Sequence, residues 1–149
     1  MFDKLFGRTK NQSSDTSDDS GDLQLAFAAL LVEAARADEK YEGHETAIID
    51  RALKTKFALN DAGAAALRAR AETAQDGAND IQRFTRIAKT MSADEKTALI
   101  EELWEIVLSD GDRDPFEDTL IRRICGLIYV DDEESGAARS RVAARLARA

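Results

Sequence analysis

Apolar residues recur every three or four positions through most of the chain, which is the spacing of one face of an α-helix. From residue 22 onward this spacing predicts about seven helices, separated by short stretches rich in Asp, Asn, Ser and Gly. No stretch alternates apolar and polar residues for long enough to predict a strand. We therefore expect an all-α fold, a compact bundle of about seven helices.

Residues that favour helix starts place several of the expected boundaries. Asp22 can N-cap the first helix, and Asn60 or Asp61 can cap an alanine-rich third helix. Ser92 and Glu95 have the spacing of a capping box, which predicts the start of a fifth helix. The residues expected to face the core are mainly Leu, Ile and Phe, among them Leu23, Phe27, Leu30, Leu31, Ile49, Leu53, Phe84, Leu99, Leu103, Ile121, Ile124 and Val142.

The first 21 residues differ from the rest of the chain. Residues 11–21 are almost entirely Ser, Asp, Thr, Asn and Gln, with no apolar side chains to bury. We expect a flexible N-terminal segment over residues 1–21 and one helical domain over residues 22–149. No apolar run approaches the roughly 18 residues of a membrane span, and residues 1–10 lack the features of a signal peptide. We therefore expect no stable membrane insertion and a cytoplasmic location.

The charge balance and the rarity of reactive residues narrow the functional class. Lys and Arg number 21 against 29 Asp and Glu, a net charge of −8, which argues against nucleic acid as a partner. The chain has one histidine and no glycine-rich phosphate loop. Its only cysteine, Cys125, lies on an apolar helix face and fits a buried thiol in a reducing compartment. These features predict a protein that is not an enzyme.

Two parts of the chain repeat one pattern at a constant separation of 72 residues. Residues 31–57 and 103–129 each read as a helix, a loop and a second helix, and their apolar positions agree. Asp38 corresponds to Asp110, and Glu45 corresponds to Glu117. Each Glu lies in a first helical turn, where the helix dipole favours a carboxylate. Each Asp lies at a helix end, where the dipole disfavours one, so it either serves a function or caps amides of the loop.

The second loop concentrates carboxylates more than the first. Asp110, Asp112, Asp114 and Glu117 fall within eight residues, and a hard cation such as Ca²⁺, Mg²⁺ or Mn²⁺ would offset their repulsion. The first three have the spacing of an EF-hand loop, but the later glycine and glutamate of that motif are missing, so we reject an EF-hand. Asp114 and Pro115 also suit the N-cap and first position of a helix.

The pair of hydrophobic helices, each ending in Ala-Asp or Ser-Asp-Gly and followed by a Glu that opens an Ile- and Leu-rich helix, resembles the tellurite-resistance TerB family. It is also similar to the helical region of membrane-anchored DnaJ-like proteins, and the resemblance covers about residues 23–146. It implies a helical bundle, a metal-binding role for Asp38, Glu45, Asp110 and Glu117, and an association with tellurite resistance or stress. Glu39 follows Asp38 where the family pattern has Gly, so the first loop departs from it.

The last helix has a basic face that offers another kind of site. Arg141, Arg145 and Arg148 share this face, which is a candidate surface for an acidic protein partner. Cations are also favoured near a helix C-terminus without any partner. Two functions follow: a domain that binds a divalent cation at the repeated carboxylates, or a metal-free module that docks proteins through its acidic loops and its basic helix.

Overall fold

The computed structural model describes residues 20–37, 41, 43–77, 81–109 and 115–148, with side chains of residues 115–117 left out. This part of the chain is all helical and contains no strand. The first helix is described over residues 20–36 and is called the N-terminal helix here. The others are α2 (Gly43–Phe57), α3 (Asp61–Asp76), α4 (Gln82–Ala88), α5 (Ala93–Ser109), α6 (Pro115–Ile128) and α7 (Asp132–Arg148). The predicted all-α fold and the number of helices are confirmed for the described residues.

Most of the predicted helix starts are also confirmed by hydrogen bonds. The Asn60 side chain accepts from the Gly63 amide at 2.7 Å. The capping box forms in both directions: Glu95 N donates to Ser92 Oγ at 3.1 Å, and Ser92 N donates to Glu95 Oε1 at 3.0 Å. The prediction for Asp22 is wrong, because residues 20 and 21 are already helical and Asp22 lies inside the helix.

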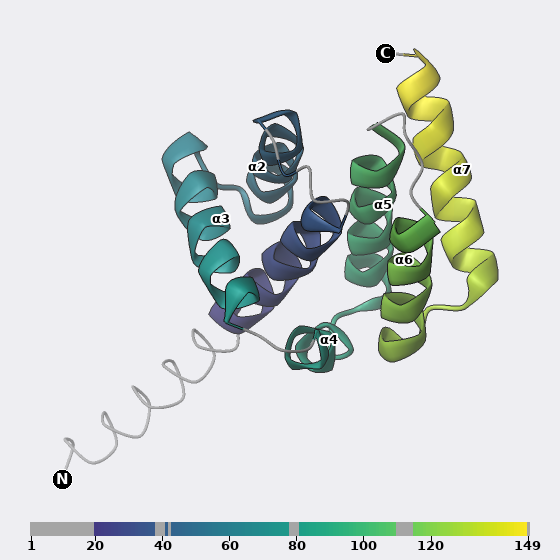
Figure 1. The fold of residues 1–149 in the computed structure, drawn as a ribbon, viewed down its shortest axis with the longest axis horizontal. Coiled ribbons are helices and arrows are strands. Elements are labelled where there is room, and N and C mark those ends of the chain that lie inside the picture. The colour runs from purple at the N-terminus through teal and green to yellow at the C-terminus, as the bar shows by residue number, and fades with distance from the viewer. Residues whose placement is uncertain (1–19, 38–40, 42, 78–80, 110–114, 149) are drawn as a thin grey trace, which may run out of the picture.

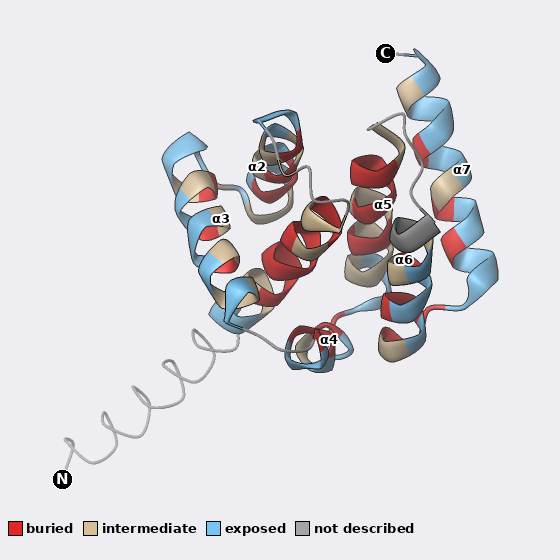
Figure 2. Ribbon diagram, viewed as in Figure 1, coloured by how far each residue is buried: buried red, intermediate tan, exposed pale blue. Residues whose placement is uncertain are grey.

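The N-terminal helix occupies the middle of the bundle. In Figure 1 it lies between α2 and α3 on one side and α5 on the other, and Figure 2 shows most of it as buried. Every residue from Ala26 to Val32 is completely buried, whereas the sequence predicted burial of only one stripe. A helix that is apolar around its whole circumference is typical of the centre of a core. Three of these seven residues are alanines, and the buried Ala34 and Ala35 follow them, so other helices can approach closely.

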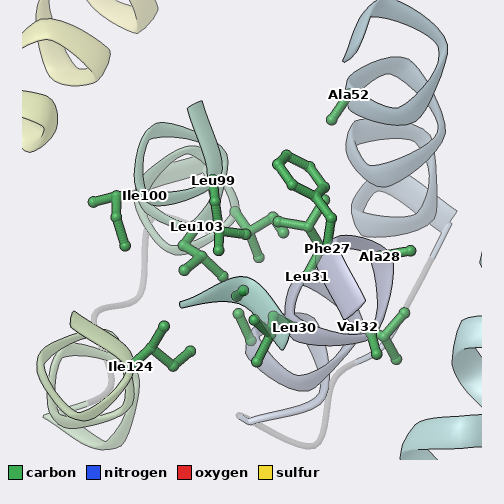
Figure 3. Packing of buried hydrophobic residues seen from close by; sticks show 14 of the residues in the cluster. Phe27, Ala28, Leu30, Leu31, Val32, Ala52, Leu99, Ile100, Leu103 and Ile124 are labelled. Atoms are coloured by element: carbon green, nitrogen blue, oxygen red, sulfur yellow. The ribbon is translucent and has the colours of Figure 1, made fainter. Parts of the chain in front are cut away.

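Large apolar side chains from the N-terminal helix and α5 form the centre of the core. Figure 3 shows Phe27 and Leu31 of the N-terminal helix beside Leu99 and Leu103 of α5, and Leu30 belongs to the same buried cluster. The Phe27 ring also meets the Phe57 ring of α2 edge to face, with centroids 5.4 Å apart. The core therefore joins the two halves of the chain.

The predicted internal repeat corresponds to two units of three helices. The N-terminal helix, α2 and α3 form the first unit, α5, α6 and α7 form the second, and α4 lies between them in the chain. In each unit the third helix is capped in the same way, since Asp131 Oδ1 accepts from the Glu134 amide as Asn60 does from Gly63. The α2 and α5 helices pack together, so the units share one core.

Candidate functional site

Most of the predicted metal ligands lie outside the described residues. Asp38, Asp110, Asp112 and Asp114 belong to the segments that the structure does not describe, and so do residues 1–19 of the segment 1–21 that we expected to be flexible, whereas residues 20 and 21 are helical. Glu117 lies in the first turn of α6, as predicted, but its side chain is not described. Glu45 is the one candidate ligand whose side chain can be examined.

Glu45 lies in the first turn of α2 and is only 3% exposed. A carboxylate is favoured at this position by the partial positive charge of the helix N-terminus. Burial of a charged group is costly unless other groups satisfy it, so this glutamate is held in a polar setting within the protein. The sequence predicted the helical position of Glu45, but it did not predict the burial.

The two repeat units come into contact beside Glu45. His44 Nε2 lies 3.4 Å from Ser109 Oγ, the last residue of α5. Ser109 directly precedes Asp110 in the chain, and His44 directly precedes Glu45. The start of α2 and the end of α5 therefore meet. His44 is exposed, and its contact with Ser109 joins residues 65 apart, so this contact was not predictable from the sequence.

Tyr41 anchors the first loop to α3. Its hydroxyl donates to Glu72 Oε2, and the Arg36 guanidinium lies over its ring, 5.0 Å from the centroid. Burial and the neighbouring Glu72 carboxylate raise the pKa of the Tyr41 hydroxyl above its usual value. The Arg68 guanidinium pairs with the same carboxylate at 3.1 Å and with Asp50 at 2.6 Å. This network fixes the chain just before α2. An isolated tyrosine between charged residues was the only signal for it in the sequence.

The predicted basic face of α7 makes contacts within the protein. Arg141 pairs with Glu101 of α5 at 3.0 Å, and Arg145 pairs with Glu105 at 2.9 Å. Arg148, at the end of α7, is exposed. About half of the Arg141 and Arg145 side chains is still exposed, at 52% and 46%, so the surface prediction stays untested.

The described side chains alone do not form a metal site. Within the part of the chain that the structure describes, no three His, Cys, Asp or Glu residues gather in a way that could hold an ion. Cys125 is buried, as predicted, and burial raises the pKa of its thiol, which disfavours the reactive thiolate. Among the described helices, none combines the length and the apolar character that crossing a membrane requires.

Comparison with known families agrees with this architecture. The family model described as tellurite resistance protein TerB matches residues 24–140, a range that begins within the N-terminal helix, spans α2 to α6 and ends within α7. No significant match was found among curated proteins or among solved structures. The match covers most of the chain and confirms the resemblance seen in the repeated motif. The chain therefore belongs to the TerB family of tellurite-resistance proteins.

Proposed function

We propose that this TerB chain is a non-enzymatic cytoplasmic domain that binds a divalent cation where its two repeat units meet, as part of a tellurite or stress response. Asp38, Glu45, Asp110 and Glu117 are the proposed ligands, with Asp112 and Asp114 as additional ones. Oxygen ligands of this kind suit Ca²⁺, Mg²⁺ or Mn²⁺. No sulfur or second histidine is near enough in sequence to favour a softer ion.

The contact between His44 and Ser109 is the observation that carries this proposal. It joins the side chain of the residue before Glu45 to the side chain of the residue before Asp110, so a described contact links the chain positions next to one candidate ligand of each unit. The buried carboxylate of Glu45 next to this contact supplies one ligand on a rigid helix. A cation at this point would also reduce the repulsion among the carboxylates of the second loop.

Thermal unfolding of chelator-treated protein tests the cation site. Addition of Ca²⁺, Mg²⁺ or Mn²⁺ at about 100 times its Kd should stabilise the fold by about 2.7 kcal/mol, a rise in Tm of roughly 10 °C. Asp38→Asn combined with Asp110→Asn should abolish the rise. The control combines Asp22→Asn with Glu133→Gln, which removes two negative charges at exposed positions outside the loops, and this variant should keep the cation-induced rise in Tm. No shift with any ion, or an equal shift in both double variants, would contradict the proposal.

A metal-free docking module is the second candidate. The exposed portions of Arg141 and Arg145, together with Arg148, support it because they present positive charge on one helix. In this case an acidic protein partner would bind with an affinity that falls as salt rises and does not respond to chelator. Arg148→Glu would weaken that binding without changing any cation-induced shift in Tm, so the two functions can be separated.

A further inference from the structure

A cavity of about 300 Å³ lies within the second repeat unit, where α5, α6 and α7 meet. It is built from side chains of all three helices, and both charge signs are present. Its lining includes Trp104, Asp118, Arg122, Asp132, Gly136 and Arg139. A volume of this size is at the lower end of the range for small-molecule sites.

The aromatic wall of this cavity is held in place from two directions. The Trp104 indole N–H donates to Ser135 Oγ at 3.1 Å, and both side chains are buried. The Arg139 guanidinium lies over the indole ring, 5.5 Å from its centroid. Arg139 Nε is buried and has no hydrogen-bond partner within the described residues. The guanidinium therefore lies against a rigid apolar surface with one N–H group unpaired, and its positive charge at the cavity wall would attract an anion.

Gly136 leaves the cavity open on the α7 side. It is an exposed residue inside α7, and a glycine inside a helix costs about 0.5–1 kcal/mol relative to alanine. A Cβ atom at this position would meet no atom within 4 Å, so packing gives no reason for the glycine. Open space at this residue enlarges the entrance beside Trp104 and Arg139.

We infer that this cavity binds a small zwitterion, an α-amino acid with an apolar side chain. The guanidinium groups of Arg122 and Arg139 recognise the carboxylate, and Asp132 recognises the ammonium group. The Trp104 ring packs against the apolar side chain. A ligand with a single charge would bind either the two arginines or Asp132, but not both. The second-unit cavity thus provides a site independent of the cation proposed at the loops.

Fluorescence of Trp104 reports on this cavity directly, because it is the only tryptophan in the chain. Titration with L-leucine or L-phenylalanine should change its emission to saturation. Removal of either charge, in 3-phenylpropanoate or phenethylamine, should weaken binding roughly tenfold or more relative to L-phenylalanine. No saturable change with either amino acid would overturn the inference. Equal affinity for L-phenylalanine and both single-charge analogues would overturn it too.

Variants separate recognition from folding. Gly136→Leu fills the entrance and should abolish amino acid binding while the Tm is maintained or raised. Gly126→Leu is the matched control: Gly126 is an exposed glycine in α6 with equally open surroundings, and it does not line the cavity, so binding should persist. Arg122→Gln should weaken the binding of L-phenylalanine and 3-phenylpropanoate but not that of phenethylamine. Asp132→Asn should weaken the binding of L-phenylalanine and phenethylamine but not that of 3-phenylpropanoate. Unchanged binding by Gly136→Leu would overturn the proposed site.

Discussion

Glu105 joins three helices through one buried carboxylate. Its Oε1 accepts from Arg145 of α7 at 2.9 Å, and its Oε2 pairs with Arg51 of α2. The glutamate side chain is 8% exposed, whereas the two arginines are about half exposed. The arginines therefore keep much of their hydration while the carboxylate depends on them.

Replacement of Glu105 by glutamine should destabilise the fold by about 2 kcal/mol. The value is below the 3–5 kcal/mol typical of a fully buried pair, because water reaches both arginines. Urea denaturation measures the loss. Arg141→Gln is the control, since it removes a more exposed ion pair and should cost less than about 0.5 kcal/mol. An equal effect of the two substitutions would mean that burial of Glu105 contributes nothing.

Glu102, also on α5, differs from Glu105 because its buried carboxylate is less well compensated by neighbouring groups. Its Oε1 is buried without a hydrogen-bond partner among the described residues, and Arg51 is 3.9 Å away. Desolvation raises the pKa of the Glu102 carboxyl above its ordinary value of 4.5, an effect that the nearby arginines only partly offset. The charged form is thus less favourable in the folded protein than in the unfolded chain.

Glu102→Gln should therefore stabilise the protein at pH 7 and lose this advantage in acid. A carboxyl whose folded pKa is raised favours the folded state at low pH, and its contribution declines as pH rises through that pKa. The difference in unfolding free energy between the variant and the parent should grow from about pH 4 to pH 7. Ala69→Gly, an exposed change on α3 that alters no titratable group, should give a difference that does not vary over this range. A destabilised Glu102→Gln at pH 7 would refute this reading.

At the scale of single helices, α2 and α6 end in the same way. Ala58 and Tyr129 follow their last residues with φ values of 53° and 64°. Leu59 N donates to Lys54 O at 3.1 Å, and Val130 N donates to Cys125 O at 2.9 Å. These bonds are those of a Schellman motif, whose left-handed residue is usually glycine. Neither position has glycine here, so both caps carry backbone strain.

Ala58→Gly should raise the free energy of unfolding by about 0.5–1 kcal/mol, because glycine adopts a positive φ without a steric penalty. Thermal or urea unfolding gives the value. Ala69→Gly makes the same chemical change at an exposed position inside α3 and should lower stability by about 1 kcal/mol. Stabilisation by both substitutions, or by neither, would show that the cap conformation does not determine the sign.

The starts of helices were more predictable than their ends. Asn60, Ser92 and Glu95 use local side-chain chemistry that is visible in the sequence, and all three cap as expected. Ala58 and Tyr129 end helices without the glycine that usually marks this place, so nothing local indicated their conformation. Asp22 is not a cap because residues 20 and 21 are already helical, and the run of Ser and Asp around it gave no single preferred start in the sequence.

For the whole molecule, the central position of the N-terminal helix is the main departure from the sequence prediction. Alanines at 28 and 29 are compatible with a buried or an exposed face, so periodicity predicted a single stripe. Which helices cover the remaining faces depends on packing between distant parts of the chain. The same reason limits the candidate site: the repeated acids were visible in the sequence, but the contact between His44 and Ser109 requires the tertiary fold.

Since the N-terminal helix packs into both units, we predict that the bundle unfolds in one transition. Leu30→Ala should cost about 2–5 kcal/mol, the usual range for a large-to-small change at a fully buried position. Trp104 emission reports on the second unit, and far-ultraviolet circular dichroism reports on all helices, so the two midpoints should shift together. Leu146→Ala, at a partly buried position near the end of α7, should cost less. Separate midpoints for the two signals would show that the units unfold independently.

The two second helices also differ in length, since α2 has 15 residues and α6 has 14. A helix turns by about 100° per residue, so loss of one residue within α6 would have rotated its later side chains out of the core. The one-residue difference in length lies at the C-terminal cap instead. Ile121 and Ile124 of α6 are therefore buried at the positions that correspond to Ile49 and Ala52 of α2. The end of α6 is therefore a point where a duplicated bundle can change length while its internal symmetry survives, and it is a rational position for a single-residue insertion.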